Sequence, residues 1–178
     1  MAVMIAAAQM NPLIGNLEAN LKNTLRLIDE AADHGANLIV FPELCNTGYA
    51  FESPQELAAA AEPVPGGRTT EAWLEKAKQK NIYIAAGIAE KEGPHIYNSA
   101  AIIGPEGFIG TYRKNHLWYN EKLIFQPGNL GFPIFDLPFG RLGIQICYDF
   151  FFMEGTRILA LKGADIIAVL TNWSADSN

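Results

Sequence analysis

Cysteine, histidine and long apolar runs are all scarce in this sequence. Its 178 residues include two cysteines and three histidines. Two cysteines cannot form a disulfide framework, and no CxxC pair or His/Cys cluster has the spacing of a zinc site. We therefore expect no metal and a reducing, cytoplasmic environment.

Runs of one charge sign are also absent. The net charge is −6, which argues against nucleic acid or an anionic membrane surface as the main partner. No apolar stretch approaches the length of a membrane span. The apolar N-terminus is short and lacks a basic flank, so Val3–Gln9 is expected to be a buried strand and not a signal peptide.

Apolar strands alternate with amphipathic helices along the chain, which predicts a layered α/β fold with a mixed sheet. No composition shift marks a linker, so we expect one domain over residues 1–178. The expected strands cover residues 3–9, 38–41, 82–87, 96–103, 108–112, 134–137, 142–147 and 165–170. The expected helices cover residues 17–34, 54–61, 68–80 and 154–162.

Two segments resemble each other locally. "HGANLIVFPEL" and "KGADIIAVLTN" each join a helix end, Gly-Ala and an apolar strand. The carboxyl ends of strands are where open α/β sheets gather ligands. Glu43, Cys147 and Asn172 all follow such strands, so we expect them to converge.

Cys147 is the first candidate for chemistry. It closes an apolar strand just before a helix, where a thiol can face a cleft, but free cysteine is also among the most buried residue types. A nucleophile needs a base. His116 is the only credible histidine, and Glu43, delivered by "LIVFP", is the other candidate.

Two further charged residues lie near aromatic side chains. Lys114 lies in "YRKNHLW" and can stabilise negative charge on a reacting carbonyl, although a solvated loop lysine is more common. Glu121 follows seven residues later and can pair with it or be an ordinary surface glutamate.

Taken together, these motifs resemble one family. "FPEL" with "TGY", then "YRKNHLW" with a later "FQPG", then "GIQICYDFFF" and "RILALKGADII" are similar to the carbon–nitrogen hydrolase family, or nitrilase superfamily. The resemblance implies a four-layer α-β-β-α sandwich. It also implies a Glu43, Lys114 and Cys147 triad, with Glu121 as a supporting second glutamate.

The resemblance further implies a reaction on a small amide, carbamoyl or nitrile substrate, with no cofactor, in a homo-oligomer (a dimer or larger). Cys147 would form a thioester, and the N–H of Tyr148 would help Lys114 to hold the oxyanion. "CYD" is more typical of amidases and carbamoyl hydrolases than of nitrilases. The residues expected to contact substrate are Tyr49, His116, Trp118, Tyr119 and Asn172.

Members of this family usually continue well beyond the strand that ends near Asn172. The resemblance therefore implies the N-terminal portion of the fold, incomplete at the C-terminus. A catalytically inactive binding or partner-dependent module is the alternative to an enzyme. A nucleotide-binding fold is set aside, because residues 104–110 match neither a dinucleotide fingerprint nor a P-loop.

Overall fold

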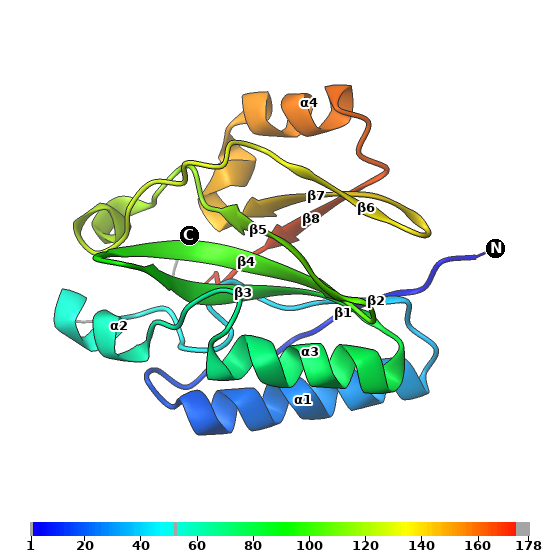
Figure 1. The fold of residues 1–178 in the computed structure, drawn as a ribbon. Helices are drawn as coiled ribbons and strands as arrows, with labels where there is room; N and C mark the ends of the chain where they lie inside the picture. The colour runs from blue at the N-terminus through cyan, green and yellow to red at the C-terminus, as the bar shows by residue number, and fades with distance from the viewer. Residues whose placement is uncertain (1, 52, 174–178) are drawn as a thin grey trace.

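The computed structural model describes residues 2–51 and 53–173. Met1, Glu52 and the closing "SADSN" lie outside the described residues. The single domain expected over residues 1–178 stays a prediction. Two β-sheets pack face to face between helical layers (Figure 1). Helices α1 and α3 cover the first sheet, and α4 covers the second.

The helices and strands fall close to the expected ranges. The strands are β1 (Ile5–Ala7), β2 (Leu38–Val40), β3 (Tyr83–Glu92), β4 (His95–Gly104), β5 (Gly107–Arg113), β6 (Ile134–Leu137), β7 (Gly140–Ile146) and β8 (Ile166–Leu170). The helices are α1 (Leu17–Asp33), α2 (Pro54–Ala60), α3 (Arg68–Lys80) and α4 (Met153–Leu161), with 3₁₀ turns η1 (Tyr119–Leu123) and η2 (Cys147–Phe151).

The strands form two sheets, where the strand pattern alone predicted one mixed sheet. The first sheet has the order β1-β2-β3-β4-β5, and the second has the order β6-β7-β8. Strands β1, β2 and β3 run parallel, whereas β3, β4 and β5 form antiparallel hairpins. In the second sheet β6 and β7 are antiparallel, and β7 and β8 are parallel. Sequence periodicity identifies strands but does not assign them to sheets.

An apolar core lies between the two sheets. Its first-sheet side includes Leu38 and Ile102, and its second-sheet side includes Leu142 and Ile144. All four are fully buried. Burial of such side chains contributes about 1.5–3 kcal/mol each, so this core is what holds the sheets together.

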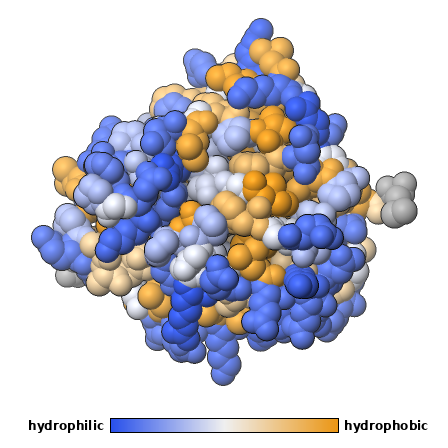
Figure 2. Space-filling view, in the orientation of Figure 1, coloured by the Kyte–Doolittle hydropathy of each residue, from blue (hydrophilic) through white to orange (hydrophobic). Residues whose placement is uncertain are grey.

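The outer helices begin and end where the sequence indicates. The side chain of Asn16 accepts a hydrogen bond from Ala19 N and caps α1. Helix α1 buries the face that carries Leu21 and Ile28 against the first sheet. Figure 2 shows mostly hydrophilic side chains over α1 and α3, and apolar ones towards the middle of the view, between the layers.

Strand β1 is shorter and more exposed than expected. Residues 3–9 were predicted to be a buried strand, but only Ile5–Ala7 is paired, and Met4 and Ile5 are exposed. Strand β1 lies at the end of the sheet order, with β2 as its neighbour. An edge strand has one unpaired side, which explains the exposure. Within the described ranges, no helix is both long and apolar enough to cross a membrane.

Candidate active site

The ends of four strands meet at one side of the sandwich. Strand β2 leads into the turn that carries Glu43, and β5 ends directly before Lys114. From the other sheet, β7 ends directly before Cys147, and β8 ends two residues before Asn172. The predicted convergence is therefore correct, but it occurs between two sheets and not along one edge.

Lys114 is buried between two carboxylates. Its Nζ lies 2.6 Å from Glu43 Oε1 and 2.8 Å from Glu121 Oε1. Asn98 Nδ2 donates to the same Glu43 oxygen at 2.7 Å. Glu121 Oε2 also accepts the N–H of Trp118 at 2.7 Å, which fixes the second carboxylate. These contacts make one cluster with little freedom to reorient.

Burial and charge act in opposite directions on this cluster. Burial raises the pKa of Glu43; Lys114 opposes that rise, and Glu121 adds to it. Burial alone would lower the pKa of Lys114, but the two carboxylates outweigh it and raise that pKa. Lys114 therefore stays protonated, and Glu43 is a stronger base than an exposed carboxylate.

Cys147 lies beside this cluster on a tight turn. The sequence predicted that Cys147 would end the strand, but the strand ends at Ile146 and Cys147 begins η2. The φ angle of Cys147 is +45°. This left-handed conformation is rare for a residue with a side chain and is typical of functional turns. Burial raises the pKa of the Cys147 thiol to about 12, and the nearby Glu43 carboxylate contributes. The thiol is therefore neutral until a base takes its proton.

Glu43 has one carboxyl oxygen available for that role. Its Oε1 holds Lys114 and Asn98, whereas its buried Oε2 has no hydrogen-bond partner in the described part of the chain. A buried acceptor without a partner is costly. An available oxygen near a thiol suits proton transfer.

Asp149 holds the turn that carries Cys147. This fully buried carboxylate accepts hydrogen bonds from Tyr112 Oη at 2.6 Å, His116 N at 2.9 Å and Ile146 N at 3.0 Å. The His116 ring also contacts it, with Nδ1 2.8 Å from Asp149 Oδ1. Asp149 therefore links β5, the Lys114 loop and the Cys147 turn.

The residues expected to contact substrate occupy different places. Tyr49 packs against the apolar cluster that contains Leu44. Burial raises the pKa of Tyr49, and the carboxylates of Glu121 and Glu43 raise it further. Trp118 packs edge-on against Tyr148, with ring centroids 4.7 Å apart.

The other three are placed differently. His116 stacks on Phe152, with centroids 3.9 Å apart, besides its contact with Asp149. The side-chain amide of Asn172 lies 3.5 Å from the Glu43 carbonyl oxygen, a long contact. Tyr119 is 75% exposed, and its contact with substrate stays a prediction.

Two residues with direct contacts to the candidate triad were missed in the sequence. Asn98 lies inside β4, where an asparagine gives no signal of its own. Trp173 follows Asn172, and its Nε1 lies 3.1 Å from Cys147 Sγ. The strand-end position that singled out Asn172 would also have indicated Trp173.

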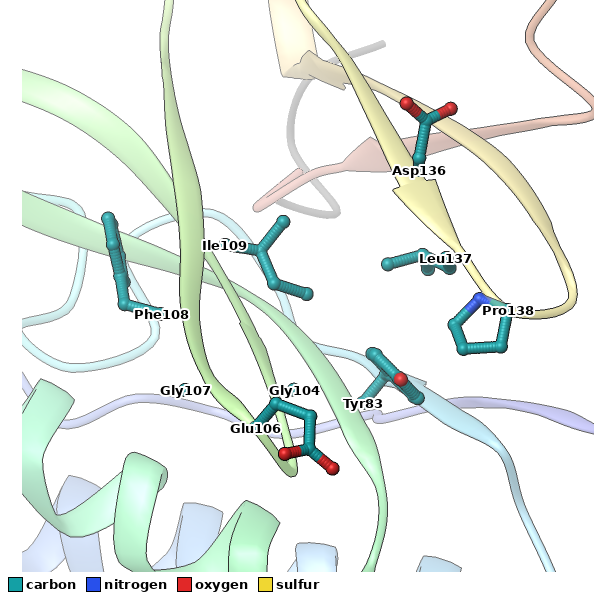
Figure 3. Close-up of a pocket in the computed structure, with 9 residues that line it drawn as sticks. All are labelled: Tyr83, Gly104, Glu106, Gly107, Phe108, Ile109, Asp136, Leu137 and Pro138. Atoms are coloured by element: carbon teal, nitrogen blue, oxygen red, sulfur yellow. The ribbon is translucent and has the colours of Figure 1, made fainter.

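A separate cleft of about 420 Å³ is lined by the first residues of β5, the turn before them and the end of β6. Figure 3 shows Ile109 and Leu137 extending towards one another across it, with the carboxylates of Glu106 and Asp136 at its margin. Strand β5 runs from this cleft to Lys114, a separation of about 20 Å at the usual rise per residue. The cleft therefore does not adjoin Cys147.

No cluster of three or more His, Cys, Asp or Glu side chains within residues 2–51 and 53–173 has an arrangement that could hold a metal ion. Both cysteines are free thiols.

A family model described as carbon-nitrogen hydrolase matches residues 4–178. The chain therefore belongs to the carbon–nitrogen hydrolase family, as the motifs indicated. It is 51% identical over 166 residues to a nitrilase of Pyrococcus abyssi (strain GE5 / Orsay), in a match that covers 93% of this chain and 63% of that protein. It is 35% identical over 172 residues to an N-carbamoylputrescine amidase of Solanum lycopersicum, covering 93% and 57%.

Solved structures confirm the fold class. A mutant of the amidase from Nesterenkonia sp. AN1 superposes with a TM-score of 0.88 at 24% identity, covering 99% of this chain and 69% of that one. The two curated relatives are longer, and the chain spans 63% and 57% of their lengths.

Proposed function

We propose that this protein is a thiol hydrolase that cleaves a carbon–nitrogen bond, other than a peptide bond, in a small amide or N-carbamoyl compound. The observation that carries the proposal is the arrangement of Cys147 beside Glu43, which is itself bound to Lys114 at 2.6 Å. The relatives named nitrilase and N-carbamoylputrescine amidase support the reaction class.

The first half of the reaction forms a thioester. Glu43 takes the thiol proton on Oε2, and Cys147 Sγ attacks the carbonyl carbon. The ammonium group of Lys114 and the backbone N–H of Tyr148 stabilise the tetrahedral oxyanion. The carbon–nitrogen bond then breaks, and Glu43 returns the proton to the leaving nitrogen, which departs as ammonia.

The second half regenerates the enzyme. Glu43 removes a proton from a water molecule, which attacks the thioester carbon. The carbon–sulfur bond breaks, and Glu43 protonates the departing Cys147 sulfur. The product is a carboxylic or carbamic acid. Lys114 keeps its charge throughout, since its pKa is raised by Glu43 and Glu121.

The substrate side of the site is aromatic and partly polar. Trp118, Tyr148 and Tyr49 supply flat apolar surface and a hydroxyl near the cluster. Such a lining suits a small, partly apolar substrate. Nitrile hydrolysis is the second candidate activity, because the nitrilase relative is 51% identical.

The test is ammonia release from a panel of small amides, N-carbamoyl amines and nitriles. We expect release with at least one class, and its loss in Cys147→Ala. Cys45→Ala is the matched control, since Cys45 is a fully buried core thiol that donates to Gly87 O. Release that persists in Cys147→Ala refutes the mechanism. A folded protein without release on any class favours the inactive binding module.

Self-association is proposed on separate grounds. The outer surface of η2 and α4 exposes Phe151, Met153 and Leu161, each more than two-thirds exposed. Exposed apolar side chains close together in the sequence, within residues 151–161, favour a protein interface. We expect a homo-oligomer in sedimentation velocity that dissociates in Met153→Glu. A monomer at all concentrations contradicts this. The cytoplasmic location stays a prediction from the scarcity of cysteine.

A further inference from the structure

Two consecutive residues after β8 contact two different members of the candidate triad. The side-chain amide of Asn172 lies 3.5 Å from the backbone oxygen of Glu43. The indole Nε1 of Trp173 lies 3.1 Å from Cys147 Sγ. The end of β8 therefore touches both the base and the sulfur that is to react.

The Trp173 contact has a direction. An indole N–H is a donor only, so the sulfur must be the acceptor. A neutral thiol accepts weakly, whereas a thiolate accepts strongly, because hydrogen bonds to ionised groups are about twice as strong as neutral ones. The contact therefore gains strength as the proton leaves the sulfur.

Other groups around the sulfur have mixed effects on its charge. Burial and the Glu43 carboxylate disfavour the thiolate, while Lys114 and Trp173 favour it. Lys114 is already shared between two carboxylates, at 2.6 Å and 2.8 Å. Trp173 is the uncharged donor in contact with the reacting atom, and it adds no proton that could be lost.

We propose that Trp173 is a further catalytic residue, whose indole N–H donates a hydrogen bond to Cys147 Sγ and stabilises the thiolate that attacks the substrate. This inference rests on the proposed function, in which Cys147 is the nucleophile. No bond is made or broken at Trp173, because its proton stays on the indole nitrogen. It contributes only while the sulfur carries negative charge, and so it favours thioester formation and the departure of the sulfur alike.

The variant Trp173→Phe separates the N–H from the ring. Trp173 is 61% exposed, so the exchange leaves the buried core intact. The loss of one donor to the thiolate is expected to raise the thiol pKa by about one unit, which lowers the thiolate fraction about tenfold at a given pH. A more basic thiolate is a better nucleophile, which recovers part of this loss. The net expectation is alkylation about three- to fourfold slower.

The experiment measures iodoacetamide alkylation of Cys147 at pH 8 by mass spectrometry, in the wild type and in Trp173→Phe. Two internal references accompany it: the Cys45 thiol in the same molecules, and both proteins unfolded in urea, where their rates must agree. Slower alkylation of Cys147 in the folded variant supports the proposal. An equal rate overturns it, and a faster rate also overturns it by showing that the ring shields the sulfur.

The alkylation assay involves no turnover, so it separates the two proposals. Slower alkylation in Trp173→Phe together with no ammonia release from the wild type refutes the hydrolase and leaves a thiolate stabilised by Trp173. Ammonia release with unchanged alkylation refutes only the role of Trp173.

Discussion

Replacing Lys114 with methionine removes the cation that two buried carboxylates share. The change keeps most of the side-chain volume but leaves Glu43 and Glu121 unpaired, where Nζ had lain 2.6 Å and 2.8 Å from them. Breaking a buried ion pair costs about 3–5 kcal/mol, because the remaining charge cannot be solvated. We expect the free energy of unfolding to fall by about 4 kcal/mol at pH 7.

The size of this loss depends on pH in a definite sense. Burial already raises the pKa of Glu43, and Lys114 opposes that rise. Without the lysine the folded-state pKa rises further above the unfolded value of 4.5. A carboxyl with a raised pKa contributes stability that is present below its unfolded pKa and lost as pH rises through its folded pKa. The defect in Lys114→Met should therefore be smaller at pH 5 than at pH 7.

Urea denaturation at the two pH values measures both effects. Lys76→Met is the matched control, since Lys76 makes a 2.9 Å ion pair with Asp29 that is partly exposed to solvent. That pair is worth at most about 1 kcal/mol. A Lys114→Met defect as small as the control's, or one that does not change between pH 5 and pH 7, refutes the picture of a cation buried between two carboxylates.

Three further variants test other parts of the structure. In Gly87→Ala the new Cβ would lie 2.6 Å from Glu43 Cα and would displace the Glu43 carboxylate. We expect kcat/KM to fall about 100-fold, measured with the substrate identified in the ammonia-release panel. An unchanged kcat/KM would show that β3 shifts to make room and that Glu43 keeps its position. Tyr112→Phe removes the 2.6 Å hydrogen bond to buried Asp149 and should cost about 2 kcal/mol in urea denaturation, so a loss below about 0.5 kcal/mol contradicts the assigned role. Burial raises the pKa of Cys45 above 9.0, so the folded thiol keeps a proton that the unfolded chain loses, and stability should fall by about 1.4 kcal/mol per pH unit above pH 9 from this group. Cys45→Ala should flatten that slope in urea titrations, and equal slopes would refute the assignment.

Much of the site geometry follows from strand ends that are visible in the sequence. Apolar runs before Glu43 and Cys147 predict strands that stop where the polar residue begins, and the structure ends β2 and β7 close to those points. The helices were predictable for the same reason, since the spacing of Leu21 and Ile28 and the cap at Asn16 are local signals. Local sequence patterns were therefore enough to predict the helices and strands and the approximate meeting of the strand ends at the site.

The remaining features depend on contacts that local patterns do not encode. Periodicity does not reveal that β2 and β7 belong to different sheets, because both read as buried strands. Nothing in the local sequence distinguishes Asn98 from its neighbours in β4, but in the folded chain its Nδ2 lies 2.7 Å from Glu43 Oε1. Contact of His116 with substrate stays a prediction; no local pattern indicated that its ring would lie against Asp149 and stack on Phe152 and Phe132. Partner choice among polar residues is decided by tertiary packing.

In the proposed mechanism, activity depends on how the two sheets pack together, because the three proposed catalytic residues follow strands of different sheets. Glu43 and Lys114 follow strands of one sheet and Cys147 a strand of the other, so a small slip between the layers separates base from nucleophile while each sheet keeps its own hydrogen bonds. Substitutions at Ile102 or Leu142, deep in the interlayer core, would then alter turnover without touching any reacting group. In such an architecture, natural variation in the apolar residues between the two sheets changes the rate of turnover.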